Sequence, residues 1–263
     1  DPGRPHRLVT SAEADRVSVD ALVARIRERL REAADPARAP GQQAYMKSEM
    51  PFLGVAVPTT RQIARAAGRE AAPDVLEGAA RVLWDEASHR EERYAAQALL
   101  GLDALRGDPQ TVPLIEHMVR TGRWWDVTDE LAHRLSDLLD ADPARTGALV
   151  RDWSTDDDLW LRRLAIIAQF GRRADLDRDL LADVIEQNAD DREFFLRKAI
   201  GWALRDAARS DPEWARVRRR ARAQPVERPR GDQAPLSAAG RGRALTGRRG
   251  ARPRRRRSGA PRR

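Results

Sequence analysis

From residue 19 to residue 203 the chain repeats one pattern, a short amphipathic helical stretch followed by a turn. The first stretch places its apolar residues at helical intervals, at Val19, Leu22, Val23, Ile26 and Leu30. Similar stripes lie within residues 76–83, 94–99, 114–119, 131–138, 149–153, 159–170, 176–185 and 195–203. No segment alternates apolar and polar residues with the period of a strand, so the sequence predicts no sheet. The chain is therefore limited to all-α folds.

The spacing of the stripes favours one all-α fold. Helices of roughly 10 to 16 residues, paired about every 35 to 40 residues and joined by short turns, are typical of HEAT-like repeats. We predict an α-solenoid in which corresponding helices of successive repeats line a concave groove. An ordinary globular helical bundle is the alternative.

One region interrupts the pattern. Ala39-Pro-Gly41 is expected to break the first helix, and residues 45–58 are the least helical part of the body, with three breaker residues and a compact apolar run. Thr59 or Thr60 is expected to cap the next helix.

Composition and charge divide the chain into three regions. Residues 1–17 are interpreted as a flexible leader, residues 18–223 as the solenoid, and residues 224–263 as a disordered tail rich in Arg, Pro and Gly. From Arg216 onward there are 18 arginines against two acidic residues, which leaves the body with 31 basic and 39 acidic residues. The high net charge therefore belongs to the tail and does not by itself indicate a DNA-binding body.

The tail has two interpretations. It is either a phosphate-binding arm or a solvated extension. The chain holds 47 arginines and only two lysines, Lys47 and Lys198, as expected of a GC-rich gene. In such a gene an out-of-frame stretch encodes Arg, Pro, Gly and Ala, so a frameshift that replaced the native end is a hypothesis.

The sequence lacks the residues that several classes of chemistry require. The chain has no Cys, and its four histidines are scattered without the spacing of metal ligands. It contains no phosphate-binding or dinucleotide-binding glycine motif, and no apolar run long enough to span a membrane. We predict a cytoplasmic protein that uses no metal and no cofactor.

Tryptophan combined with charge marks three neighbourhoods. They are residues 121–129, 158–165 and 193–205. In the first, a helix would place Trp125 and Asp129 on one face, because residues four apart are neighbours on a helix surface. Each neighbourhood alone is also compatible with ordinary core packing. A solenoid would bring the three together in one groove.

These neighbourhoods carry a resemblance to a known family. The marks are Tyr45-Met-Lys-Ser-Glu-Met-Pro-Phe-Leu-Gly54, Trp124-Trp125-Asp126-x-x-Asp129, Leu159-Trp-Leu-Arg-Arg163 and Glu193-Phe-Phe-x-x-Lys-Ala-Ile-Gly-Trp202. From about Gln42 to Trp214 the chain resembles the AlkD-like DNA alkylation repair glycosylases, which are built from HEAT-like repeats. That family usually continues past this point with further helix, which the tail does not resemble.

The resemblance implies an activity and its residues. It implies hydrolysis of the N-glycosidic bond of cationic N3- and N7-alkylpurines in double-stranded DNA, without base flipping and without a cofactor. By position, Asp129 resembles the catalytic carboxylate, flanked by Trp125 and Trp202. Arg163 resembles the groove arginine that contacts the DNA backbone.

Further residues are candidates for DNA contact. The resemblance places Phe194 or Phe195 beside the cleft. Local basic residues are expected to supply the DNA affinity that the acidic body lacks: Lys47, Arg61, Arg120, Arg123, Arg163, Arg197 and Lys198. We expect a monomeric bacterial protein that associates with the nucleoid when it is on DNA. The sequence leaves open whether the lesion is a small methyl group or a bulky adduct.

Two other functions remain as alternatives to the glycosylase. One is a noncatalytic HEAT-like protein that binds distorted or branched DNA, and the other is a protein–protein scaffold. The carboxylate of Asp129, four residues after Trp125, favours the enzyme, because a protein that only binds DNA has no need of a carboxylate near phosphate.

Overall fold

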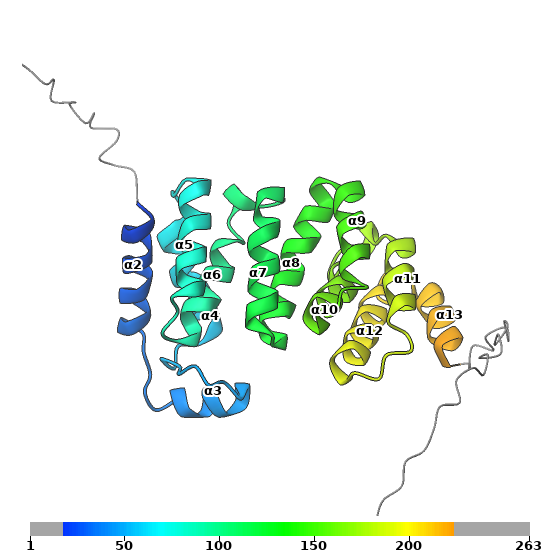
Figure 1. Ribbon diagram of the computed structural model, residues 1–263, viewed down its shortest axis with the longest axis horizontal. Helices are drawn as coiled ribbons and strands as arrows, with labels where there is room; N and C mark the ends of the chain where they lie inside the picture. Colours follow the sequence, from blue (N-terminus) through cyan, green and yellow to red (C-terminus); the bar gives the residue numbers. More distant parts are fainter. Residues whose placement is uncertain (1–17, 224–263) are drawn as a thin grey trace, which may run out of the picture. The chain divides into compact units, whose positions relative to one another are not determined.

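The computed structural model describes residues 18–223, which form helices and turns and contain no strand (Figure 1). Five helices form a layer that we call the site layer, in which each helix packs on the next: α4 (Val57–Gly68), α6 (Arg90–Leu99), α8 (Trp125–Ala141), α10 (Leu159–Ile167) and α12 (Phe194–Ala207). The remaining long helices are α2 (Val19–Glu32), α5 (Pro73–Asp85), α7 (Val112–Gly122), α9 (Pro143–Trp153), α11 (Arg178–Gln187) and α13 (Pro212–Ala223).

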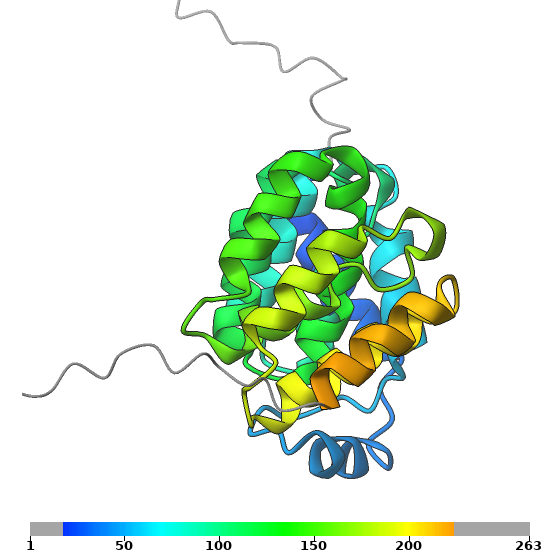
Figure 2. The same ribbon diagram turned by 90° about the vertical axis from the view of Figure 1, so that its right-hand side faces the viewer.

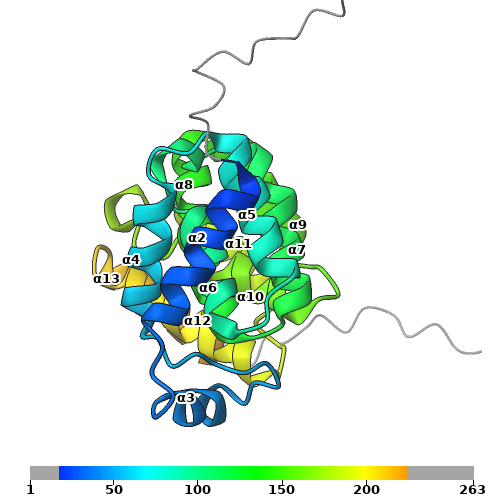
Figure 3. The same ribbon diagram turned by 90° about the vertical axis from the view of Figure 1, so that its left-hand side faces the viewer.

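The helices stack in pairs, in chain order. Helix α5 packs on α6, α7 on α8 and α9 on α10, and α5, α7 and α9 lie together on one side of the stack (Figure 3). At the end of the stack formed by the last described helices, α13 packs on α12 (Figure 2). The fold is an α-solenoid, which confirms the predicted class.

Amphipathic stripes explain this packing. The buried residues of α2 are Leu22, Val23, Ile26 and Leu30, the residues that the periodicity selects. Together with the stripes of the following helices they form one continuous apolar core, since each helix must bury its apolar face against a neighbour.

Two local predictions about the interrupting region are wrong. Ala39 begins a short helix, α3 (Ala39–Met46), because a proline in the first turn removes no intrahelical hydrogen bond. Helix α4 begins at Val57, with Ala56 at its N-cap position, so neither Thr59 nor Thr60 caps it. The predicted leader and tail lie outside the described residues.

A buried carboxylate fixes the segment between α3 and α4. Glu91 is 0% exposed and accepts hydrogen bonds from the backbone N–H groups of Leu53, Gly54 and Val55, at 3.0, 2.9 and 3.1 Å. Gly54 has a φ of +89°, and a Cβ there would lie 2.0 Å from the carbonyl oxygen of Asp35. The segment is therefore held on one side by Glu91 and on the other by a close approach that only glycine permits.

We expect Glu91→Ala to lower the free energy of unfolding by about 3 kcal/mol, because three backbone N–H groups, two of them in buried hydrogen bonds, lose a charged acceptor. Urea denaturation would measure this change. Glu28→Ala, at an exposed position of α2, is the matched control and should change the stability little. An equal loss in both variants would show that Glu91 has no special role.

Candidate functional site

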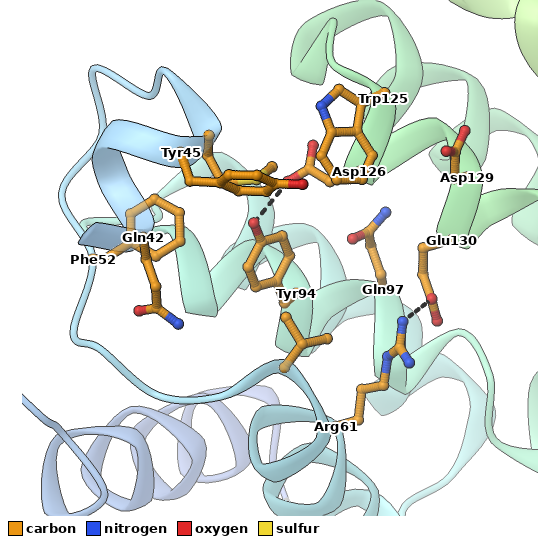
Figure 4. Close-up of a pocket in the computed structure, with 12 residues that line it drawn as sticks. Gln42, Tyr45, Phe52, Arg61, Tyr94, Gln97, Trp125, Asp126, Asp129 and Glu130 are labelled. Atoms are coloured by element: carbon orange, nitrogen blue, oxygen red, sulfur yellow. Dashed lines mark hydrogen bonds and ion pairs between the residues drawn. The ribbon is translucent and has the colours of Figure 1, made fainter. Parts of the chain in front are cut away.

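The first turns of α8 carry the centre of the site. Trp124 is extended at the N-cap position, and the helix begins at Trp125, so Trp125 and Asp129 stand one turn apart. Both line a cavity of about 440 Å³, together with Tyr45 and Tyr94 (Figure 4). The prediction that the indole and the carboxylate share a face is confirmed.

Asp129 is held by an arginine from the next repeat. The Nε and Nη2 atoms of Arg163 each donate to a carboxylate oxygen of Asp129 at 2.9 Å. The third nitrogen, Nη1, donates to the carbonyl oxygen of Phe195 at 2.7 Å. Arg163 is only 1% exposed, so its whole guanidinium is committed to α8 and α12. Its role as a contact to the DNA backbone stays a prediction.

The environment of Asp129 acts on its pKa in both directions. Burial raises the pKa, while the charges of Arg163 and Lys198 lower it, and the balance leaves the pKa above its ordinary value. The side chain keeps 20% exposure. A carboxylate with one exposed side and a perturbed pKa is typical of a functional group.

Helix α12 adds cations and aromatic rings. The Nζ atom of Lys198 lies 5.0 Å from the ring centre of Trp202 and 5.9 Å from that of Phe194, one turn away on either side. The guanidinium of Arg163 lies 5.5 Å from the ring centre of Trp202. Both cations are therefore within cation–π range of Trp202. Phe194, Lys198 and Trp202 therefore share one face of α12.

The two phenylalanines have different surroundings. Phe194 is 65% exposed. Phe195 is half-buried, with its ring centre 5.7 Å from that of Trp124 and 4.9 Å from that of Trp160. Phe194 is the one whose ring is open to a ligand.

Two basic candidates lie at helix ends. Lys47 ends α3 with a φ of 50°, and Arg123 ends α7 with a φ of 42°. The left-handed conformation is unfavourable for residues with a Cβ and tends to persist at functional positions. Both side chains are exposed, Lys47 two residues after Tyr45 and Arg123 just before Trp124.

A second buried ion pair lies beside Trp125, and the sequence did not reveal it. Arg90 donates to both oxygens of Asp126, with its Nη2 atom at 2.8 and 3.0 Å, and the hydroxyl of Tyr94 donates to Asp126 at 2.7 Å. Burial and the Asp126 carboxylate raise the pKa of Tyr94, so the hydroxyl remains a donor. Arg90 and Asp126 are 36 residues apart, about one repeat, and this spacing was the available signal.

The sequence did not reveal two arginines at the end of α4, Arg65 and Arg69, which lie beside Arg61, one of the expected DNA contacts. Arg61 pairs with Glu130 and lines both the cavity and an adjoining cleft of about 670 Å³. Arg65 and Arg69 follow at one-turn intervals and line the same cleft. Both are exposed, and neither forms an ion pair within the part of the chain that the structure describes.

The described residues carry neither a metal cluster nor a membrane-spanning helix. Between Ser18 and Ala223 no three His, Asp or Glu side chains converge as metal ligands. In that range no helix is long and apolar enough to cross a membrane.

These features define a class of protein, a helical-repeat protein with a paired carboxylate between aromatic side chains. The sequence model of the DNA alkylation repair enzyme family matches residues 26–217. The chain belongs to this family, which supports a role in the repair of alkylated DNA.

A solved structure has a similar fold. It is described as "Predicted DNA alkylation repair enzyme from Enterococcus faecalis" and has a TM-score of 0.63 and 24% sequence identity. The match covers 70% of this chain and 87% of that chain. At this identity the likeness concerns the fold. No curated protein is significantly similar to the chain.

The Asp129–Arg163 pair leads to a prediction. We expect Arg163→Met to raise the pKa of Asp129 further, because burial then acts on the carboxylate without its nearest cation. At a pH between the ordinary pKa and the raised pKa, Asp129 is ionised in the unfolded state but keeps its proton in the folded state. The stability of the variant should therefore fall as the pH rises from the ordinary pKa of 3.8 through the raised pKa.

Carboxyl NMR titration would measure this pKa, and urea denaturation at several pH values would measure the stability. Arg162→Met is the matched control, since Arg162 pairs with Asp191 at 2.7 Å. The control should leave the pKa of Asp129 unchanged. An unchanged pKa in Arg163→Met would contradict the assigned electrostatics.

Proposed function

We propose that the protein is a monofunctional DNA glycosylase that hydrolyses the N-glycosidic bond of N3- and N7-alkylpurines in duplex DNA. The observation that carries this proposal is the position of Asp129, a half-buried carboxylate fixed by Arg163 in a cavity wall beside Trp125. The membership of the DNA alkylation repair family supports it.

The chemistry suits these residues. An N3- or N7-alkylpurine is already cationic, so the bond between C1′ and the base breaks with its electron pair going to the base, which leaves neutral. Positive charge develops on the sugar, where a fixed carboxylate stabilises it. Water then adds to C1′ and loses a proton to Asp129 or to solvent, which gives an abasic site. The reaction needs no group that protonates the base.

Aromatic and basic side chains complete the proposed roles. Electron-rich rings attract a cationic sugar, and we assign this role to Trp125 and Trp202. We assign DNA contact to exposed side chains around the site: Lys47, Arg123, Phe194 and Lys198. Arg163, which is buried and donates to Asp129 and to the carbonyl oxygen of Phe195, is assigned the positioning of Asp129 in place of a contact to the DNA backbone. We expect a monomer that binds duplex DNA and acts without base flipping.

A noncatalytic protein that binds distorted DNA is the second candidate. It is favoured by the pairing of both Asp129 oxygens with Arg163, which offsets the charge that catalysis would use. A carboxylate offers about four lone-pair sites, however, so the pair leaves acceptors for water. Glycosylase activity and DNA binding are measured separately, which separates the two candidates.

We expect Asp129→Asn to lower the release of free 7-methylguanine and 3-methyladenine from methylated duplex DNA by at least about 100-fold. Its binding to the same duplex should be nearly unchanged. Asp152→Asn, at an exposed position of α9, is the matched control and should retain activity. Equal loss of binding and release would argue against a catalytic role, and no release by the wild type would favour the second candidate.

The α4 arginines lead to a further prediction. We expect Arg65→Ala and Arg69→Ala to weaken duplex binding and to reduce the slope of log K against log salt by about 0.9 for each phosphate that the variant no longer neutralises. Arg145→Ala, at an exposed position of α9 outside the site layer, is the control. If neither variant changes the salt slope, Arg65 and Arg69 do not belong to the DNA interface.

A further inference from the structure

A row of buried polar side chains on α6 faces the first turn of α8. Arg90, Tyr94 and Gln97 follow one another at intervals of four and three residues, so they share one face of α6. All three side chains are buried. A buried polar group is unfavourable unless it forms a hydrogen bond, so the partners of these residues show what the row holds in place.

The partners of the row lie in the first turn of α8. Arg90 and the hydroxyl of Tyr94 donate to the carboxylate of Asp126, at 2.8 and 2.7 Å. The Nε2 atom of Gln97 donates to the carbonyl oxygen of Val127 at 2.9 Å. Tyr94 and Gln97 both point from α6 toward this turn (Figure 4). The row therefore binds a side chain and a backbone group of two consecutive residues.

The first turn of α8 depends on this support because its N-cap residue supplies none. Trp124 occupies the N-cap position, and its side chain forms no capping hydrogen bond. The carboxylate of Asp126 instead accepts a hydrogen bond from the backbone N–H of Val127 at 2.9 Å. The helix dipole also favours a carboxylate at this end of a helix. Asp126 therefore takes the place of the missing cap and connects the start of α8 to α6.

Trp125 and Asp129 take their positions from this turn. Trp125 is the first residue of α8 and directly precedes Asp126, while Asp129 lies one turn further along the helix. Arg163 holds Asp129 from α10. In the described part of the chain no side chain forms a hydrogen bond with the indole of Trp125. The backbone of the turn and the packing around it therefore decide where this ring lies.

We propose that Arg90, Tyr94 and Gln97 are positioning residues that place Trp125 and Asp129 at the reacting sugar by fixing the first turn of α8. The proposal rests on the proposed function, because the sugar reacts only if the protein is a glycosylase. The row is buried and acts without touching DNA. A displacement of about 1 Å at a reacting centre can lower a rate about 100-fold, so the loss of part of this row should slow the reaction.

The double variant Tyr94→Phe/Gln97→Met tests the proposal. It keeps the aromatic ring and the length of the side chain but removes two hydrogen bonds to α8, while Arg90 still pairs with Asp126. We expect the release of 7-methylguanine from methylated duplex DNA at saturating enzyme to slow at least about tenfold. Binding to the same duplex should be nearly unchanged. The rates are compared at a temperature at which urea denaturation shows every variant to be folded.

A second measurement does not depend on activity. The protein is labelled with 5-fluorotryptophan, and the fluorine NMR signal of Trp125 is identified as the one that Trp125→Phe lacks. We expect the double variant to shift or broaden this signal in the DNA-free protein, because the turn that carries Trp125 is less firmly held. A row that contributed only to stability would leave the signal of the folded protein unchanged.

Asn188→Leu is the matched control. The Nδ2 atom of Asn188 donates to the carbonyl oxygen of Ser154 at 2.9 Å, and both residues are buried at the ends of helices outside the site layer. The control loses a buried amide–carbonyl hydrogen bond of the same kind as that of Gln97, and should keep the rate and the Trp125 signal. Equal slowing in the control overturns the proposal, as does an unchanged rate or an unchanged Trp125 signal in the double variant.

The result is distinguishable from a failure of the proposed function. Release of alkylpurines by the wild type, together with an unchanged rate and Trp125 signal in the double variant, would reject the positioning row alone. A changed Trp125 signal without any release by the wild type would reject the glycosylase and leave the row as the element that positions Trp125.

Discussion

The contact between Arg163 and Asp129 is the interaction on which the geometry of the site depends. A guanidinium is expensive to bury unless its nitrogens find acceptors, and all three nitrogens of Arg163 do, on α8 and on α12. The contact therefore fixes three successive helices of the site layer with respect to one another. Because α12 is docked through the carbonyl oxygen of Phe195, Trp202 lies beside Arg163 and Lys198 acts on the charge of Asp129.

Similar pairs recur along the solenoid at about one repeat. Their partners are separated by 36, 36, 34 and 32 residues in Arg90–Asp126, Arg120–Asp156, Asp129–Arg163 and Asp140–Arg172. Successive repeats place equivalent positions side by side, so opposite charges one repeat apart meet. The outer pairs are partly exposed and contribute little stability. The two least exposed of these four pairs, Arg90–Asp126 and Asp129–Arg163, flank Trp125.

The periodicity of the sequence was sufficient to predict which residues share a face of the same helix. The stripe of α2, the shared face of Trp125 and Asp129, and the spacing of Lys198 and Trp202 follow from a 3.6-residue turn alone. Helix α3 was missed because Pro40 was interpreted as a breaker, although a first turn accepts proline. These errors concern helix starts, which depend on backbone geometry more than on residue pattern.

Contacts between repeats could not be predicted in the same way. Arg163 lies among apolar residues of α10, and nothing within that helix shows whether its guanidinium points to a phosphate or to a carboxylate 34 residues away. The cavity joins Tyr45, Tyr94 and Trp125, which come from three separate helices. Only the stacking of repeats places them together, and stacking is decided by the whole core.

The structure also separates two tryptophans that the family resemblance treats alike. The ring of Trp202 already lies near two of the protein's own cations, Lys198 at 5.0 Å and Arg163 at 5.5 Å. The ring of Trp125 meets the edge of Tyr45 at 6.4 Å and forms part of the cavity wall. A ring that attracts cations has less attraction left for another when two are already near it. Of the two rings, Trp125 therefore has more attraction left for a cationic sugar, while Trp202 also holds the cations that act on the charge of Asp129.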